Sequence, residues 1–470
     1  MESAEKVCII GAGGSGIVAA QVLDARGIPF DCFEKGSHVG GNWRFENDNG
    51  MSSAYRSLHI NTSRRVMAFK TMPMPDHFPD YPDHFQMAAY FDEFVDHFGL
   101  REKISFRTEV VKVEPADGAW AVTTRSSDGA ERTEGYRAVL VANGHHWDPR
   151  WPEPAFPGSE EFEGEQMHAH HYREPDVLRG KRVLVLGLGN SATDIAVESS
   201  RIAEKTFLAV RRGAYVLPKY MNGKPLDEIS NPIFSLLPFS VQRFFAMRGL
   251  EIAAGDMTTY GLPKPDHKLF EAHPTVSSEL LPRLGHGDIT VKPNIDRFAG
   301  GRTVRFADGS EEEVDLVVYC TGYRITFPFF DPKVFSAPDN RLPLYRRVVS
   351  VERPGLYFIG FIQPFGPIMP LAEAQAEWVA DLLKGRAALP PAGQQHYGEA
   401  IRRWIDVFTK EASTGTTAAA VAEVIHTALT AEHPKGLYTG DWSTAAMEAV
   451  VSLAPQGLLD WMRRRMQHLE

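Results

Sequence analysis

Residues 6–35 read KVCIIGAGGSGIVAAQVLDARGIPFDCFEK, and this stretch decides the fold. Apolar residues 7–10 predict a buried strand, and Gly11-x-Gly13-x-x-Gly16 predicts a tight turn that opens a helix. A second strand then ends in Glu34. The glycines let the backbone approach a pyrophosphate at the positive helix N-terminus. The acid, about 20 residues further on, is expected to accept hydrogen bonds from a ribose diol.

The same pattern returns later in the chain. Residues 181–200, KRVLVLGLGNSATDIAVESS, predict a strand, the turn Gly187-x-Gly189-x-x-Ala192 and a helix. In this second turn Ala192 replaces the third glycine, a variant that tightens the packing of the helix. The sequence therefore predicts two nucleotide-binding units in one chain.

Both copies also close in the same way. Short alternating strands around an Asp-Gly turn are followed by a buried strand, AVLVANG in the first copy and DLVVYCTG in the second. Such segments predict a small antiparallel meander. From first to last glycine, the copies span 133 residues (Gly11 to Gly144) and 135 residues (Gly187 to Gly322).

We therefore predict an α/β fold with two dinucleotide-binding, Rossmann-like domains, each with a small antiparallel meander, the second domain being inserted in the first. The predicted boundaries are 1–155 for the first part of the first domain and 156–322 for the inserted second domain. Residues 323–470 are predicted to form the second part of the first domain and a C-terminal helical region.

The two copies differ at the position that reads the ribose. Twenty-three residues after the first glycine, copy one has Glu34 and copy two has Val210, followed by Arg211 and Arg212. An acid favours a free 2′-hydroxyl, whereas guanidinium groups favour a 2′-phosphate. Copy one therefore suits the AMP half of FAD, and copy two suits NADPH over NADH. A solvated strand end is the alternative interpretation of the arginine pair.

Composition and charge exclude several classes of partner. Apolar residues make up 43% and charged residues 23% of the chain, and the formal net charge is −10. This balance argues against nucleic acid or an anionic membrane as the main partner. No apolar run reaches the ~20 residues that a bilayer span requires, and MESAEK at the N-terminus is no secretory signal. The three cysteines, with no C-x-x-C pair, are expected to be buried, reduced thiols of a cytoplasmic protein.

Residues 162–175, FEGEQMHAHHYREP, crowd three histidines ahead of the second glycine turn. A metal site is improbable there, because no cluster of further cysteine, histidine or glutamate ligands accompanies them. The spacing Phe162-x-Gly164-x-x-x-His168-x-x-x-Tyr172-Arg173 instead resembles the fingerprint of the flavin-containing monooxygenases. The related Baeyer–Villiger monooxygenases carry tryptophan at the position of Tyr172. His170 and its neighbour His171 are expected to be solvated loop residues.

Other segments extend this resemblance over nearly the whole chain. VGGNWRF at 39–45 looks like the family's second FAD segment, and the block that begins YRSLHINTSRR at 55 is similar to its SL-x-x-NTS block. GLGNSATDIAVE at 187–198 resembles the NADP turn. HPTVSSELLPRLGHGDITVKPNI at 273–295 resembles the stretch ahead of the second meander, and FIQPFGPIMP at 361–370 the late flavin segment.

The resemblance implies a mechanism. NADPH reduces FAD, O2 adds to give a C4a-hydroperoxyflavin, and a soft nucleophile, an amine nitrogen or a sulfide sulfur, takes the distal oxygen. NADP⁺ stays bound and shields the adduct from water. Asn61 is expected to donate a hydrogen bond near flavin N5 and the nicotinamide ribose, and is our candidate catalytic residue. The alternative is an asparagine that caps the following helix.

The resemblance also implies roles for further residues. Gly41 and Trp43 belong to the second FAD segment, and Trp43 packs either on the flavin or simply in the core. Gln363 is expected to pair with the pyrimidine edge of the flavin, since a carboxamide both donates and accepts. Asn190 and Ser191 are expected to meet the NADP pyrophosphate, Tyr323 to face the cofactor, and His168 to set the geometry between the cofactors. Local backbone pairing alone is the alternative for His168.

Two further questions stay open. The same cofactor chemistry could oxidise ketones in Baeyer–Villiger fashion, or run uncoupled as an NADPH oxidase or reductase. Residues 220–280 have no counterpart in the first copy, and we interpret them as a lid or an oligomer surface, with a homodimer as one possibility.

The stretch HFQMAAYFDEFVDHFGL at 84–100 predicts a helix whose apolar stripe, including Phe85, is core.

Overall fold

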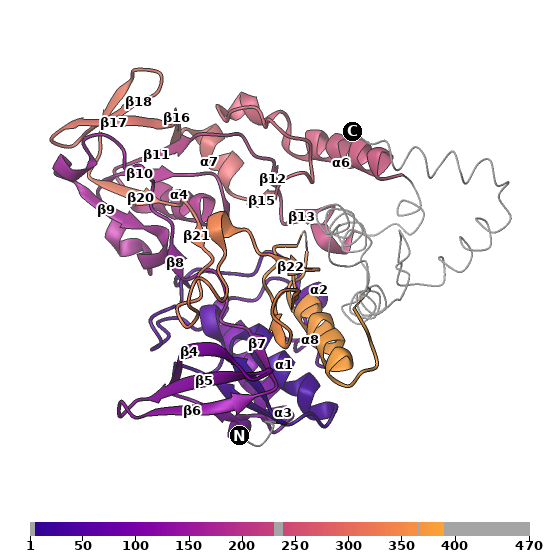
Figure 1. Cartoon of the computed structure of the whole chain (residues 1–470). Coiled ribbons are helices and arrows are strands. Elements are labelled where there is room, and N and C mark those ends of the chain that lie inside the picture. Colours follow the sequence, from indigo (N-terminus) through magenta and orange to yellow (C-terminus); the bar gives the residue numbers. More distant parts are fainter. Residues whose placement is uncertain (1–4, 230–237, 365, 390–470) are drawn as a thin grey trace, which may run out of the picture.

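The computed structural model describes residues 5–229, 238–364 and 366–389, which form two domains, each built around a sheet (Figure 1). The first sheet has seven strands in the order β22-β23-β24-β7-β1-β2-β3. Its strands are β1 (Val7–Ile10), β2 (Phe30–Phe33), β3 (Ile104–Ser105), β7 (Ala138–Val141), β22 (Leu344–Tyr345), β23 (Val349–Ser350) and β24 (Leu356–Phe358). Strands β24, β7, β1, β2 and β3 are parallel.

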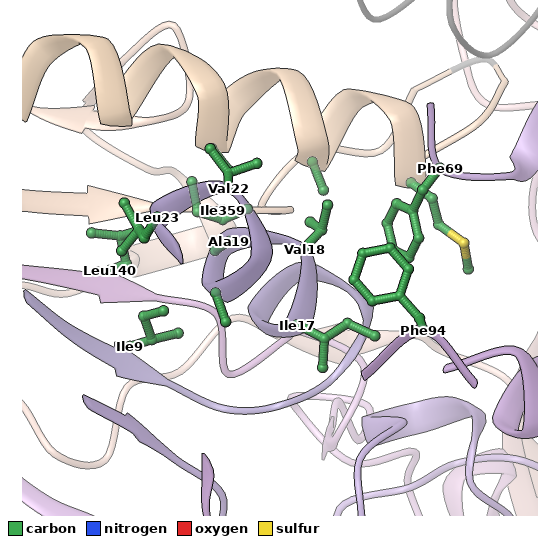
Figure 2. Close-up of a cluster of buried hydrophobic side chains, with 14 of the residues drawn as sticks. Ile9, Ile17, Val18, Ala19, Val22, Leu23, Phe69, Phe94, Leu140 and Ile359 are labelled. Atoms are coloured by element: carbon green, nitrogen blue, oxygen red, sulfur yellow. The ribbon is translucent and has the colours of Figure 1, made fainter. Parts of the chain in front are cut away.

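Helix α1 (Gly14–Ala25) follows β1 and is almost wholly buried along its length. One side packs on the sheet, where Ile9 and Leu140 are buried, and another packs against α8 (Met369–Leu383). Figure 2 shows Val18 and Val22 of α1 pointing toward this second helix. A helix buried on two sides needs apolar residues nearly all round, which explains its weakly one-sided sequence.

The second sheet has five strands in the order β16-β11-β10-β20-β9, all parallel to their neighbours. They are β9 (Glu165–His168), β10 (Arg182–Leu186), β11 (Lys205–Val210), β16 (Ile289–Pro293) and β20 (Leu316–Tyr319), with helix α4 (Asn190–Ile202) after β10. Because the first sheet takes strands from both sides of this segment in the sequence, the insertion of the second domain in the first is confirmed. The boundaries themselves stay a prediction.

Each domain carries the expected three-stranded antiparallel meander. The first is β4 (Thr108–Ala116), β5 (Ala119–Ser126) and β6 (Glu131–Tyr136), and the second is β17 (Ile295–Gly300), β18 (Thr303–Phe306) and β19 (Glu311–Glu313). The two segments that cross between the domains pair with each other, as β8 (Asp148–Pro149) and β21 (Tyr323–Arg324). The α/β class with two Rossmann-like units is thus confirmed.

The remaining helices are α2 (Arg64–Met67), α3 (His84–His97), α6 (Phe239–Ala254) and α7 (Leu280–His286). The helix α3 lies where we expected it, but Phe85 was wrongly placed in the core, since 52% of this residue is exposed. Within residues 5–229, 238–364 and 366–389, no helix has the length and apolarity to cross a membrane. The predicted C-terminal helical region and part of the 220–280 segment lie outside the described residues.

The cysteines were only partly predicted. All three are free thiols, and Cys8 and Cys32 are buried in the first sheet. Cys320, however, is only half-buried at the end of β20, where the chain leaves the second sheet for the first domain.

Candidate active site

The first glycine turn is shaped for close backbone contact. Gly11 has φ +99°, and a Cβ on Gly16 would lie 1.8 Å from the Gly11 carbonyl oxygen. Gly13 meets Gly41 of the second FAD segment, since a Cβ on Gly41 would lie 3.0 Å from the Gly13 Cα. No side chain caps the N-terminus of α1. A narrow turn of glycines with free helix N–H groups fits a diphosphate.

Glu34 directly follows β2, beside this turn, and only 4% of it is exposed. Its carboxylate accepts hydrogen bonds from the backbone N–H groups of Ala12 and Gly36, both at 2.8 Å, and from the Asn49 amide at 3.2 Å. These bonds fix the carboxylate at the carboxyl end of the strand, where such an acid meets a ribose.

The second turn has the same shape but more room. Gly187 has φ +131°, and a Cβ on Gly189 would meet nothing within 4 Å. The Asn190 carboxamide oxygen accepts from the Val276 N–H at 2.8 Å, so this side chain fixes the turn to β15 (Thr275–Val276). Ser191 is half-buried, and no side chain caps α4. The uncapped helix end again fits a diphosphate.

Arg211 and Arg212 follow the end of β11, and both are exposed. The Arg212 guanidinium binds Asp266 through two nitrogens, each at 3.0 Å. Arg211 has no hydrogen-bonding or ionic partner among the residues that the structure describes. Of the two arginines, Arg211 is therefore the one whose charge is not paired with a carboxylate among the described residues.

Phe162 and Gly164, two residues of the linker fingerprint, pack within the second domain. The Phe162 ring lies 4.7 Å from the Phe298 ring of the meander, centroid to centroid. A Cβ on Gly164 would lie 2.5 Å from the Phe162 ring, so only glycine lets the aromatic side chain fold back there.

His168 is fully buried at the end of β9, in the crossing between the two domains. Its Nδ1 accepts from the His170 N–H at 3.0 Å, and its Nε2 has no hydrogen-bond partner. Burial, reinforced by the neighbouring His170, lowers the pKa of His168 to about 4. The imidazole is therefore neutral at physiological pH. The local backbone bond of the alternative interpretation is thus present, and the role of His168 between the cofactors stays a prediction.

His170 was expected in solvent, and this prediction was wrong, because only 5% of it is exposed. The Tyr323 ring lies within 6 Å of three histidine rings, those of His146, His168 and His170. His171 is exposed as expected. Nowhere in the described part of the chain do three or more histidine, cysteine, aspartate or glutamate side chains gather as a metal site would require.

Tyr172 is fully buried, and its hydroxyl donates to Glu198 of α4 at 2.5 Å. The next residue, Arg173, is one that we did not single out from the sequence. Its guanidinium donates to the carbonyls of Ser52 at 2.9 Å and His170 at 2.6 Å, so it joins the first domain to the linker. The fingerprint itself held this signal, since an arginine closes it.

Asn61 lies on the loop before α2 and is half-buried. The alternative of a helix cap is wrong, because the residue before α2 is Ser63 and no side chain caps that helix. The Asn61 carboxamide makes no hydrogen bond with any residue in the described ranges. Its two donors and its acceptor are thus free for a ligand.

Trp43 and Gln363 lie at two other edges of the expected flavin site. Trp43 ends the short helix η1 (Gly41–Trp43) and is packed, half-buried, against the first core. Gln363 is exposed, on the loop between β24 and α8. On this loop Gly360 packs against Ser15 of α1, where a Cβ would lie 2.2 Å from Ser15 Oγ. The late segment thereby reaches the first glycine turn.

Comparisons with known proteins agree with this architecture. Residues 4–424 match the Flavin-binding monooxygenase-like family. The chain belongs to the flavin-containing monooxygenase family. It is 37% identical over 402 residues to flavin-containing monooxygenase 5 of Oryctolagus cuniculus, covering 82% of this chain and 74% of that one. It is similarly 36% identical over 403 residues to dimethylaniline monooxygenase [N-oxide-forming] 2 of Mus musculus, covering 82% and 75%.

A solved structure also resembles this flavin-containing monooxygenase. S-allyl-L-cysteine S-oxygenase from Allium sativum superposes with a TM-score of 0.61 at 26% identity, over 89% of this chain and 84% of that one. Membership of the family makes the protein a flavin-dependent monooxygenase that uses FAD and NADPH. The residues of the two glycine turns fit these two dinucleotides.

Proposed function

We propose that this monooxygenase uses NADPH and O2 to oxygenate soft nucleophiles, the nitrogen of amines or the sulfur of sulfides. One oxygen atom goes to the substrate and the other leaves as water. The names of two relatives, an N-oxide-forming monooxygenase and an S-oxygenase, support this substrate class. A sulfide or a deprotonated amine attacks through a lone pair that it already carries, so no enzymic base has to generate the nucleophile.

The residues around the first turn would hold FAD. The turn of Gly11, Gly13 and Gly16 lets its diphosphate approach the uncapped N-terminus of α1, and Glu34 binds the ribose of its AMP half. When bound, FAD supplies the redox chemistry: it takes a hydride from NADPH and activates O2 at its C4a atom. Trp43, Gln363 and Tyr323 are our candidates for contact with the flavin ring system.

The second turn would hold NADPH. Gly187, Gly189 and Ser191 surround the uncapped N-terminus of α4, where the diphosphate binds, while Asn190 fixes the turn. Arg211 binds the 2′-phosphate. Arg212 binds it as well, after giving up its ion pair with Asp266. Two charge-assisted partners of this kind favour NADPH over NADH.

Asn61 carries the proposal. A carboxamide without any partner in the protein, held on a short ordered loop, is a donor positioned in advance for a ligand. It would donate a hydrogen bond near flavin N5 and to the retained NADP⁺, and so help to keep water from the reacting atoms.

A rapid-mixing experiment tests the proposal. The purified yellow protein is reduced anaerobically with one equivalent of NADPH and then mixed with O2, and the flavin spectrum is followed. We expect an oxygenated spectrum that persists and that decays faster when a sulfide or an amine is added. Acceleration by a ketone alone would assign the enzyme to Baeyer–Villiger chemistry. Immediate return to oxidised flavin with stoichiometric H2O2 would make it an oxidase.

A further inference from the structure

Two residues of the second domain, Lys219 and Asp227, bind the backbone of the Asn61 loop on either side of Asn61. Lys219 precedes the hairpin of β13 (Tyr220–Met221) and β14 (Lys224–Pro225), and Asp227 lies in η6 (Leu226–Glu228). The Lys219 ammonium donates to the Ile60 carbonyl at 3.2 Å, and Asp227 accepts from the Ser63 N–H at 2.7 Å. The two contacts flank Asn61 on the neighbouring backbone and leave its own side chain free.

Lys219 and Asp227 are held as one unit. The Lys219 carbonyl accepts from the Leu226 N–H at 2.9 Å, which closes the hairpin and sets the distance between the two residues. The same carbonyl accepts from the Tyr81 hydroxyl at 2.5 Å, and the Lys219 ammonium lies 4.9 Å from the centroid of the Tyr81 ring. Tyr81 belongs to the first domain, so this contact adds to those with Ile60 and Ser63.

The groups around these two contacts are largely buried. Ile60 and Ser63 are fully buried, and one carboxylate oxygen of Asp227 is buried without a hydrogen-bond partner. Burial raises the pKa of Asp227 and lowers that of Lys219, whose charge is supported by Asp194 of α4. Hydrogen bonds in such an environment are stronger than in water and hold a backbone firmly.

We propose that Lys219 and Asp227 are positioning residues for Asn61. They fix the backbone on either side of it, so that the place of its carboxamide depends on the NADPH domain. Residues 219–228 therefore form a positioning element, and the lid or oligomer surface expected for residues 220–280 stays a prediction. This proposal rests on the proposed function of Asn61.

The variants remove each contact separately. Lys219→Met removes the ammonium and keeps the apolar stem, while Lys219→Arg keeps a donor. Asp227→Leu removes the acceptor, while Asp227→Asn keeps one. Glu228→Gln is the matched control: it lies in the same short helix and pairs with Arg65 at 2.8 Å, but 62% of the Arg65 side chain is exposed and the pair touches no backbone beside Asn61.

Two measurements are made on each FAD-loaded variant. Hydrogen–deuterium exchange of the Ser63 amide, without NADPH, reports directly on its hydrogen bond to Asp227. We expect about tenfold faster exchange in Asp227→Leu, the effect of losing one hydrogen bond. The share of NADPH electrons released as H2O2 reports the position of Asn61. It should rise at least threefold in Lys219→Met and Asp227→Leu, with the anaerobic rate of flavin reduction within twofold of the parent.

The conservative variants and Glu228→Gln should match the parent in both measurements. Unchanged H2O2 release in Lys219→Met and Asp227→Leu, in an enzyme whose parent oxygenates and whose Asn61→Asp variant does not, would overturn the proposal. Slower flavin reduction with unchanged H2O2 release would also overturn it, because the segment would then place the cofactors. If Lys219→Met loses FAD, the milder Lys219→Gln decides by the same criteria. A parent that never oxygenates would refute the proposed function instead.

Discussion

The hydroxyl of Tyr55, in the first domain, donates a 2.5 Å hydrogen bond to Asp194 of α4, in the second. One turn further along the same helix, Glu198 accepts from Tyr172 of the linker, and the two tyrosine rings lie 5.8 Å apart, centroid to centroid. Because the N-terminus of α4 forms the second glycine turn, the Tyr55 bond ties the nicotinamide site to the flavin domain.

Tyr55→Phe should slow flavin reduction by NADPH about tenfold, since a small displacement between reacting atoms costs rate steeply. Tyr172→Phe is the matched control, because it leaves another half-buried carboxylate of α4 without its donor but removes no hydrogen bond between the two domains. Both changes should cost about 1–3 kcal/mol of stability. Stopped-flow reduction and urea unfolding separate the two effects. Equal reduction rates in both variants would refute the role of Tyr55.

Asn61→Asp should uncouple the enzyme. The substitution keeps the shape and removes the amide donor, and loss of one such donor typically costs about a hundredfold in rate. We expect most NADPH electrons to appear as H2O2, measured beside NADPH oxidation in the presence of a sulfide. Asn61→Gln, which keeps a carboxamide, should recover part of the coupling. Full coupling in Asn61→Asp would remove this residue from the site.

Arg211→Gln should raise the KM for NADPH about tenfold or more and leave that for NADH nearly unchanged, because a charge-assisted bond to phosphate contributes about 1.5–3 kcal/mol. Arg212→Gln should have a smaller effect, since Arg212 already pairs with Asp266. Steady-state kinetics with both nucleotides provide the comparison. An equal rise for NADPH and NADH would show that the arginines do not read the 2′-phosphate.

Gly16→Ala should yield colourless protein. The new Cβ would lie 1.8 Å from the Gly11 carbonyl oxygen, so the strand, turn and helix could not keep their positions. Gly189→Ala, in the second turn, adds a Cβ where nothing lies within 4 Å and should bind FAD normally. The FAD content of each purified variant, read from its absorbance, is the measurement. Full flavin content in Gly16→Ala would contradict the expectation.

His168 should make stability fall in acid. Burial keeps its pKa near 4, whereas in the unfolded chain it returns toward 6.5. Between these values the unfolded state binds a proton that the native state does not, so stability present above pH 6.5 is lost as the pH falls, by up to about 3 kcal/mol. His168→Asn should therefore lose less stability than the parent between pH 7 and pH 4. Parallel urea-unfolding curves would contradict this.

The fold could be predicted from the sequence because each predicted element depends on a local pattern of residues. The apolar residues of β1 and the glycines of the first turn specify the β-α-β unit without any distant contact, and the second copy repeats them. The helix α3 was also predictable, but not which of its residues face solvent at its first turn. Phe85 lies beside Phe45, with ring centroids 6.0 Å apart, and stays exposed.

The contacts between the domains could not be predicted. Lys219 reaches Ile60 across 159 positions, and Tyr55 reaches Asp194 across 139. No periodicity relates such pairs, since they follow from how two finished domains meet. The burial of His170 has the same origin, because it lies in the crossing between the domains, near Tyr323.

The first sheet takes strands from both ends of the described chain, with β1 and β24 on either side of β7. During synthesis the ribosome therefore releases the whole inserted domain while the first sheet still lacks β22, β23 and β24, and α1 still lacks α8. Domains generally fold as units as they emerge. The nicotinamide half, although it starts second, can thus be complete first, and the flavin half waits at least for α8 before it can enclose its cofactor.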